Sequence, residues 1–143
     1  MRCPTCREPL IVVERDSIEL DHCPWCRGLW CDAGELELLA ERFAGGWRPD
    51  LAELPAATPP EKPRRCPRCD VRMVALRAGT APEVVIDRCP AGHGAWLERG
   101  ELGALISQRA EAVAPGSAEV VAFLGETFRA LLSGRVPALR GEK

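Results

Sequence analysis

Residues 23–36 read CPWCRGLWCDAGEL, and residues 89–102 read CPAGHGAWLERGEL. Both stretches start with a Cys-Pro pair, carry a tryptophan seven positions after that cysteine, and end in Gly-Glu-Leu. A second cysteine pair lies upstream of each stretch, in CPTC at residues 3–6 and CPRC at residues 66–69. The chain is therefore a tandem repeat of a unit of about forty residues.

The repeats set the expected domain organisation. We expect a first repeat with its helix at residues 1–46 and a second at residues 64–114. Between them, residues 47–63 hold five of the thirteen prolines, which predicts an extended and stiff linker. We expect residues 115–143 to form a C-terminal helix and tail, since apolar residues have helical spacing from Ser117 to Ser133.

Each repeat has the pattern of a β-hairpin followed by a helix. The runs at 10–13 and 18–20 favour strands, and 73–76 and 84–86 repeat them with a longer loop through Gly79 and Pro82. Apolar residues then recur at helical spacing after each tryptophan. Asp32 and Glu35 have the spacing of a capping box, and Glu101 has the same position in the second repeat. We therefore interpret both glutamates as helix caps and not as catalytic carboxylates.

The cysteines of the first repeat have the spacing of a metal site. Two CxxC pairs joined by a hairpin can bring four thiolates together in a tetrahedron. The predicted ligands are Cys3, Cys6, Cys23 and Cys26. We expect Gly28 to adopt a positive φ close to the metal. A thioredoxin-like redox pair would need a βαβ unit, which the sequence does not contain.

The second site differs at one position, because Gly92 stands where the first repeat has Cys26. His93, one residue further on, can supply a fourth ligand of the Cys₃His type. The predicted set is Cys66, Cys69, Cys89 and His93. The alternative is an unligated surface histidine beside a site that has lost its metal.

Four further residues are assigned to packing. His22 corresponds to Arg88 and is interpreted as a strand residue, not a ligand. Cys31 corresponds to Leu97 and is expected to be a small apolar residue of the core. Trp30 and Trp96 are expected to pack the helix onto the ribbon and to shield the thiolates from water.

The composition and the number of predicted metal ligands argue against several classes of function. The 143 residues contain no apolar run near the roughly 20 residues needed to span a bilayer. The N-terminus lacks the apolar core of a secretory signal, so we expect a cytoplasmic chain with reduced cysteines. A site with four protein ligands leaves no open position for catalysis, which argues against an enzyme and a small-molecule substrate. Two Zn²⁺ per chain then have a structural role, since forty residues bury too little apolar surface alone.

The quoted motifs resemble the bacterial zinc-ribbon family named after the zinc finger of transcription factor IIB. CPTC with CPWCRGLWCDAGEL carries the resemblance in the first repeat, and CPRC with CPAGHGAWLERGEL carries it in the second. The resemblance implies a small metal-stabilised α+β fold of two tandem zinc ribbons. It also implies zinc ligation by the seven cysteines named above and a regulatory or assembly role, without defining a target.

The distribution of charge and the spacing of the ligands leave three hypotheses about function open. Residues 1–45 hold five basic and nine acidic groups, and residues 62–109 hold nine basic and five acidic groups. One hypothesis is a protein partner or self-association through these opposite charges, or through the C-terminal helix. Another is nucleic-acid binding by a basic strip, although the pI of 5.8 is acidic. The strip comprises Lys62, Arg64, Arg65, Arg68, Arg72 and Arg77. The third is a rubredoxin-like iron site for electron transfer, because spacing does not distinguish the metals.

Overall fold

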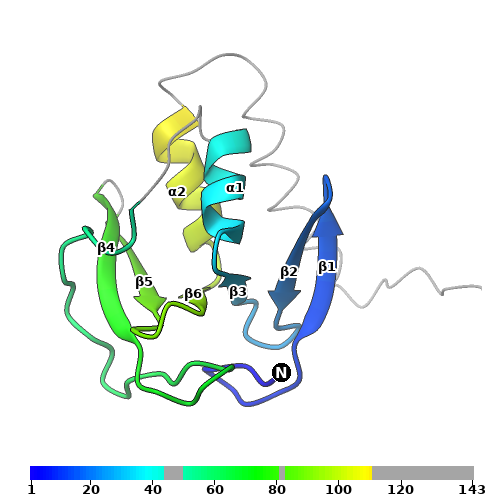
Figure 1. The fold of residues 1–143 in the computed structure, drawn as a ribbon, viewed down its shortest axis with the longest axis vertical. Helices are drawn as coiled ribbons and strands as arrows, with labels where there is room; N and C mark the ends of the chain where they lie inside the picture. The colour runs from blue at the N-terminus through cyan, green and yellow to red at the C-terminus, as the bar shows by residue number, and fades with distance from the viewer. Residues whose placement is uncertain (44–49, 81–82, 111–143) are drawn as a thin grey trace, which may run out of the picture.

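The structure is a computed structural model that describes residues 1–43, 50–80 and 83–110. It has six strands and two helices in the described residues (Figure 1). They are β1 (Ile11–Arg15), β2 (Ile18–His22), β3 (Leu29–Asp32), α1 (Glu35–Phe43), β4 (Val74–Thr80), β5 (Glu83–Arg88), β6 (Gly94–Leu97) and α2 (Glu101–Ala110). All strands belong to one antiparallel sheet of order β1-β2-β3-β6-β5-β4.

The predicted α+β fold with two zinc-ribbon copies is confirmed. β1 with β2 and β4 with β5 are the expected hairpins. The second hairpin differs from the expected long loop, because β4 continues through Gly79 to Thr80 and pairs with β5 across a bulge. The bulge absorbs extra residues within the strand. Pro82 and the predicted helix 117–133 lie outside the described residues.

The third strand of each repeat joins the two copies. β3 and β6 pair antiparallel at the centre of the sheet, and Trp30 is directly opposite Trp96. The strand order is symmetric about this pair, so each repeat supplies one half of the sheet. The amide of Ala33 also donates to the carbonyl of His93 at 2.9 Å, which extends the junction beyond the strands.

Both helices pack on one face of the sheet. α1 contacts β2 and β3, α2 contacts β4 and β5, and the helices contact each other. The sheet curves around them, while the cysteine-bearing turns lie at the opposite end of the molecule (Figure 1). In the described residues, neither helix is long and apolar enough to cross a bilayer.

The glutamates cap the helices as predicted. The Asp32 amide donates to the Glu35 carboxylate at 2.7 Å, and the Glu98 amide donates to the Glu101 carboxylate at 2.6 Å. The other half of the predicted box differs: the Asp32 carboxylate accepts from the Trp30 indole at 2.8 Å. α1 begins only at Glu35, and Gly34 in front of it has φ 89°.

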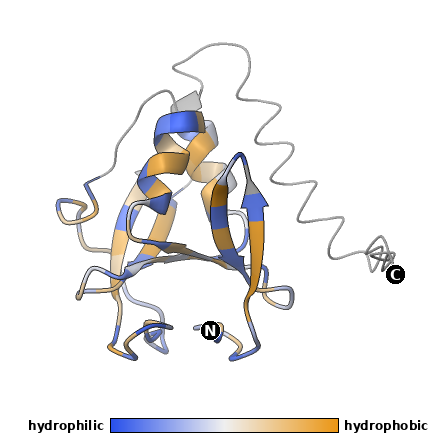
Figure 2. Ribbon diagram, turned by 45° about the vertical axis from the view of Figure 1, so that its right-hand side comes forward, coloured by the Kyte–Doolittle hydropathy of each residue, from blue (hydrophilic) through white to orange (hydrophobic). Residues whose placement is uncertain are grey.

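Alternation along the central strands creates two cores. Side chains of a strand point to opposite faces in turn, so Leu29 and Cys31 join the core under the helices while Trp30 joins the cysteines. Trp96 does the same in β6. The tryptophans therefore cover the thiolates as expected, but they lie on the face away from the helices. Hydrophobic segments of strands and helices meet in the helix-side core (Figure 2).

The linker is part of the sheet edge. The amide of Arg77 donates to the carbonyl of Pro55 at 2.8 Å, and the amide of Ala57 donates to the carbonyl of Ala75 at 3.0 Å. Ala56 forms an isolated antiparallel bridge with Leu76 between these two bonds. Residues 55–57 of the proline-rich stretch thus run extended along β4.

Candidate metal centres

The first centre brings together the four predicted cysteines of the first repeat. Their sulfur atoms all lie within 4.8 Å of one another. Cys3 and Cys26 have Sγ atoms 3.4 Å apart, and so do Cys6 and Cys23. Cys3 and Cys23 are fully buried. The amide of Thr5 points at Cys3 Sγ from 3.3 Å, an arrangement that stabilises a thiolate.

Tight turns hold these cysteines. Each turn closes on the amide of the residue after its second cysteine, as in the 3.0 Å bond from Arg7 to the carbonyl of Cys3. That residue adopts a left-handed conformation, with φ 67° at Arg7, 66° at Arg27 and 61° at Asp70. The positive φ expected at Gly28 is therefore wrong, because Arg27 carries it. Gly28 is required for space, since a Cβ there would lie 2.0 Å from the Trp96 ring.

The second centre contains the three predicted cysteines and His93. Its ligand atoms also lie within 4.8 Å of one another. Cys69 and Cys89 have Sγ atoms 3.6 Å apart, and His93 Nδ1 lies 3.5 Å from Cys89 Sγ. In this turn the left-handed residue is Gly92, with φ 81°, in the position of Cys26. The longer imidazole reaches the centre from the following residue.

The donor sets fit zinc. A tetrahedral site with Zn–S bonds of 2.3 Å places its sulfurs about 3.8 Å apart, close to the separations in both centres. Cys₄ and Cys₃His are standard donor sets for structural zinc. The two clusters are Cys3, Cys6, Cys23 and Cys26, and Cys66, Cys69, Cys89 and His93. Each offers four protein atoms, which fills a tetrahedron.

The thiols of the second centre differ in acidity. Burial raises the pKa of Cys66 to about 11. Burial also acts on Cys89, but hydrogen bonds from the His93 backbone and side chain outweigh it and lower the pKa of Cys89 to about 6. Since zinc binds thiolates, metal binding at this centre releases protons from the more basic thiol.

The residues assigned to packing lie outside both clusters. His22 is buried in β2, and burial lowers its pKa to about 4, so the ring is neutral. Cys31 is fully buried in the helix-side core, and burial raises the pKa of its thiol well above the ordinary range. A thiol held protonated and out of contact with water is a poor nucleophile.

The predicted basic strip is largely neutralised within the chain. Arg64 Nη1 pairs with Asp87 Oδ2 at 2.6 Å, and its other nitrogen pairs with Glu98. Arg68 forms a forked pair with Asp32 of the other repeat. The remaining pairs are Arg65 with Asp70 and Arg77 with Glu83. Among the described residues, these pairs leave only Lys62 and Arg72 of the strip without an ion pair.

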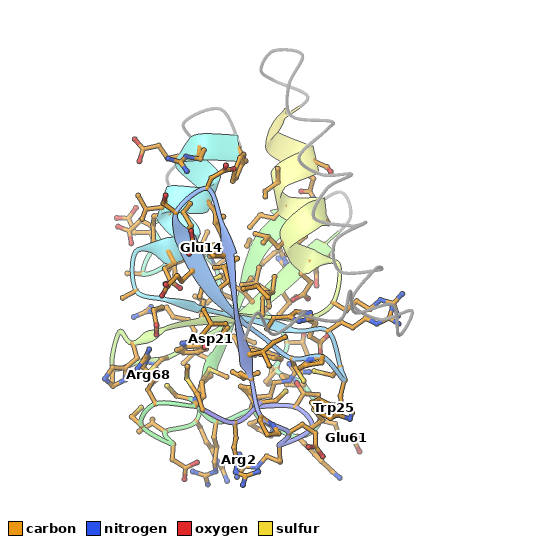
Figure 3. The ribbon with its side chains drawn as sticks, turned by 90° about the vertical axis from the view of Figure 1, so that its right-hand side faces the viewer. Arg2, Glu14, Asp21, Trp25, Glu61 and Arg68 are labelled. Atoms are coloured by element: carbon orange, nitrogen blue, oxygen red, sulfur yellow. The ribbon has the colours of Figure 1, made fainter. Side chains whose placement is uncertain are left out.

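One feature was missed from the sequence, namely the exposure of Trp25. Its side chain is 61% exposed on the turn between Cys23 and Cys26, whereas Trp30 and Trp96 are fully buried. Trp25 projects at the metal-bearing end of the molecule, near Glu61 (Figure 3). Its counterpart in the second repeat is Ala91, so the repeat gave a signal: a position that varies between copies is free of the shared core.

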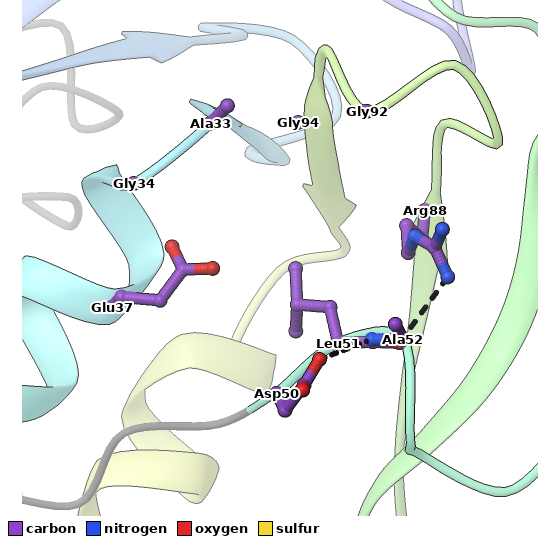
Figure 4. Close-up of a pocket in the computed structure, with 9 residues that line it drawn as sticks. All are labelled: Ala33, Gly34, Glu37, Asp50, Leu51, Ala52, Arg88, Gly92 and Gly94. Carbon is purple, nitrogen blue, oxygen red and sulfur yellow. Dashed lines mark hydrogen bonds between the residues drawn. The ribbon is translucent and has the colours of Figure 1, made fainter.

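An open pocket of about 500 Å³ lies between the repeats, beside the start of α1 (Figure 4). Its polar groups already bond locally, since Arg88 donates to the Leu51 carbonyl and the Ala52 amide donates to Asp50 Oδ1. The other lining residues are Ala33, Gly34, Glu37, Gly92 and Gly94. Among the described residues that line it, the side chains include the Glu37 and Asp50 carboxylates but no serine, cysteine or histidine.

Comparison with known families agrees with this geometry. The Transcription factor zinc-finger family, a zinc ribbon of the transcription factor IIB type, matches residues 2–42 and 65–108. The chain belongs to this family. The two matched segments correspond to the two repeats, each with one four-ligand cluster, so the resemblance inferred from the motifs is confirmed. No curated protein and no solved structure matches the chain significantly.

Proposed function

We propose that this zinc-finger protein is a non-enzymatic interaction module of the cytoplasm with a regulatory, transcription-related role. Two structural zinc ions, bound by the eight clustered residues, would hold the turns in place. The observation that supports the proposal is that each cluster offers four protein ligand atoms within 4.8 Å of one another, enough to close a tetrahedral centre. A closed centre has no position for substrate or water. The family's description as a transcription factor zinc finger supports the regulatory role.

The metal assignment is tested by elemental mass spectrometry on chains purified without added metal. We expect two zincs per wild-type chain and one in His93→Ala. Cys31→Ala is the matched control, because it removes a cysteine that lies outside both clusters, and it should retain two zincs. Iron in place of zinc would overturn the structural role and favour the rubredoxin-like hypothesis. An unchanged count in His93→Ala would remove His93 from the ligand set.

Trp25 is the residue we propose for partner contact. Exposed tryptophans next to a rigid turn are frequent anchors of protein interfaces, and the turn here is fixed at both cysteines. Quantitative affinity capture should recover partners that bind wild type but not Trp25→Ala. Val74→Ala is the control, since Val74 is also exposed, at 44%, but lies on β4 of the second repeat. Recovery independent of Trp25 would exclude this surface.

Nucleic-acid binding is the second candidate function. Trp25 is an aromatic side chain available for stacking on a base, and Arg2, Lys62 and Arg72 are exposed. Against it, most of the predicted basic strip is already ion-paired. Fluorescence anisotropy with labelled DNA and RNA decides: affinity that falls steeply with salt and requires Trp25 would favour nucleic acid. We expect no such binding.

A further inference from the structure

The two outer edges of the sheet differ in whether another segment of the described chain pairs with them. β4 at one edge is covered by residues 55–57, which bond to its backbone. β1 is the opposite edge, and among residues 1–43, 50–80 and 83–110 no segment pairs with its outer side. Figure 1 shows the two edges on either side of the helices. A bare strand edge offers backbone donors and acceptors to another chain.

The repeat identifies the groups on the bare edge. Val12 pairs with Asp21 as Ala75 pairs with Asp87, so Val12 corresponds to Ala75 and Glu14 to Arg77. On β4 these positions supply the carbonyl and the amide that bind the linker. The Val12 carbonyl and the Glu14 amide therefore point outward from β1. The exposed fractions agree with one bare and one covered edge: Val12 on β1 is 63% exposed, whereas Ala75 on β4 is 5% exposed.

The β1 edge carries an acidic cross-strand pair where the covered edge carries an ion pair. Glu14 and Glu19 are directly opposite each other on β1 and β2, and both are exposed. Like charges in this position repel. A recess of about 360 Å³ adjoins them, lined also by Glu35, Ile18 and Leu38, with Ser17 at the turn. At the other edge, Arg77 is paired with Glu83. No described lysine or arginine pairs with Glu14 or Glu19.

We propose that the outer edge of β1 binds an extended segment of a partner protein that carries lysine or arginine, and that this segment adds a strand to the sheet. The inference rests on the proposed interaction function and names the partner's chemistry. Backbone bonds to Val12 and Glu14 give the pairing, and the basic side chains offset the Glu14–Glu19 repulsion. A second copy of β1 is a poor occupant, because it would bring two acidic edges together.

The probe is a synthetic peptide built on the segment that covers β4, acetyl-Lys-Leu-Pro-Ala-Ala-Thr-Lys-amide. It is added to the full-length, zinc-loaded chain labelled with ¹⁵N. We expect amide exchange at Glu14 to slow about tenfold at saturation, while the Arg77 amide, already bonded to Pro55, is unchanged. Glu14→Lys/Glu19→Lys should abolish the effect. Glu53→Lys/Glu61→Lys changes the charge equally at exposed sites elsewhere and should keep it.

Three results would overturn the inference. Exchange at Glu14 unaffected by peptide means that the edge does not accept a strand. Protection at Glu14 without peptide, independent of concentration, means that another part of the chain covers the edge. Protection that rises with protein concentration means that a second copy does. The Trp25 capture experiment uses a different end of the molecule, so capture that persists while the peptide fails leaves the proposed function standing.

Discussion

Trp96 of the second repeat lies over Gly28 of the first, so closely that a Cβ at Gly28 would be 2.0 Å from Cζ2 of its ring. The reciprocal contact places the Trp30 ring 2.9 Å from a Cβ built on Gly94, which has φ 152°. Each tryptophan thus packs on the turn of the other repeat. The tryptophan ring excludes a side chain at Gly28, whereas at Gly94 the backbone carbonyl of Cys31, 2.1 Å from the built Cβ, excludes one together with the Trp30 ring.

Gly28→Ala should therefore destabilise the fold by steric overlap alone, because Gly28 does not have a positive φ. Overpacking of this severity costs about 2–4 kcal/mol. Urea denaturation with zinc in excess measures the loss. Gly103→Ala is the control: it lies in α2 with no atom within 4 Å of an added Cβ, and it should gain about 1 kcal/mol. Equal effects of the two substitutions would contradict the close packing at Gly28.

Arg64→Met should cost about 2–3 kcal/mol, because it leaves the Asp87 carboxylate buried without its charged partner. Asp87 is 3% exposed, and the pair is 2.6 Å long. Asp87→Asn in the same chain should recover part of the loss, since the amide is neutral. Arg65→Met breaks an exposed pair of 3.8 Å and should cost under about 0.5 kcal/mol. Chemical denaturation of the four chains tests this, and similar losses for both arginines would refute it.

The features that occur in both repeats could be predicted from the sequence. The hairpins, both helices with Glu35 and Glu101 as caps, and the two clusters all follow from local periodicity and ligand spacing. Burial of Cys31 was also predicted correctly, because its counterpart is leucine. These inferences need only residues close in sequence or the comparison of one copy with the other.

The contacts between repeats could not be predicted in this way. β3 and β6 have four residues each and are buried on both faces, so they lack the alternation of apolar and polar residues that marks a strand. The role of Gly28 depends on a ring from the other copy. The pairing of Pro55 and Ala57 with β4 could not be predicted either, because nothing in the linker sequence indicates that it pairs with the edge of a sheet.

The shared core predicts that the zinc centres are coupled. Cysteines of both clusters pack with Trp30 and Trp96 in one group. Removing a ligand from the second centre should loosen this group and speed zinc release from the first about tenfold, the size of effect seen when groups that support metal ligands are lost. Release to a chromogenic chelator from His93→Ala measures the rate, with Cys31→Ala as the control. Release from the first centre at the wild-type rate would show that the centres are independent.

Burial disfavours the ionised carboxylate of Glu101 and raises its pKa to about 7. The Glu98 amide opposes this by donating to it at 2.6 Å. A carboxyl with a raised pKa in the folded state contributes its full stability below its unfolded pKa of 4.5, and that stability is lost as the pH rises through 7. The wild type should therefore lose stability relative to Glu101→Gln as the pH rises from about 4.5 through 7, with the loss complete by about pH 8. The glutamine retains an acceptor for the amide.

Partial exposure screens the effect, so we expect a difference of about 1 kcal/mol at pH 8.5. Urea denaturation at a series of pH values, with zinc saturating, gives the two curves. Glu35→Gln is the matched control at the equivalent cap of α1, where burial also raises the pKa of the carboxyl but by a smaller amount. Its curve should diverge from wild type less than that of Glu101→Gln. Parallel curves for wild type and Glu101→Gln would mean that the Glu101 carboxyl ionises in the folded chain without penalty.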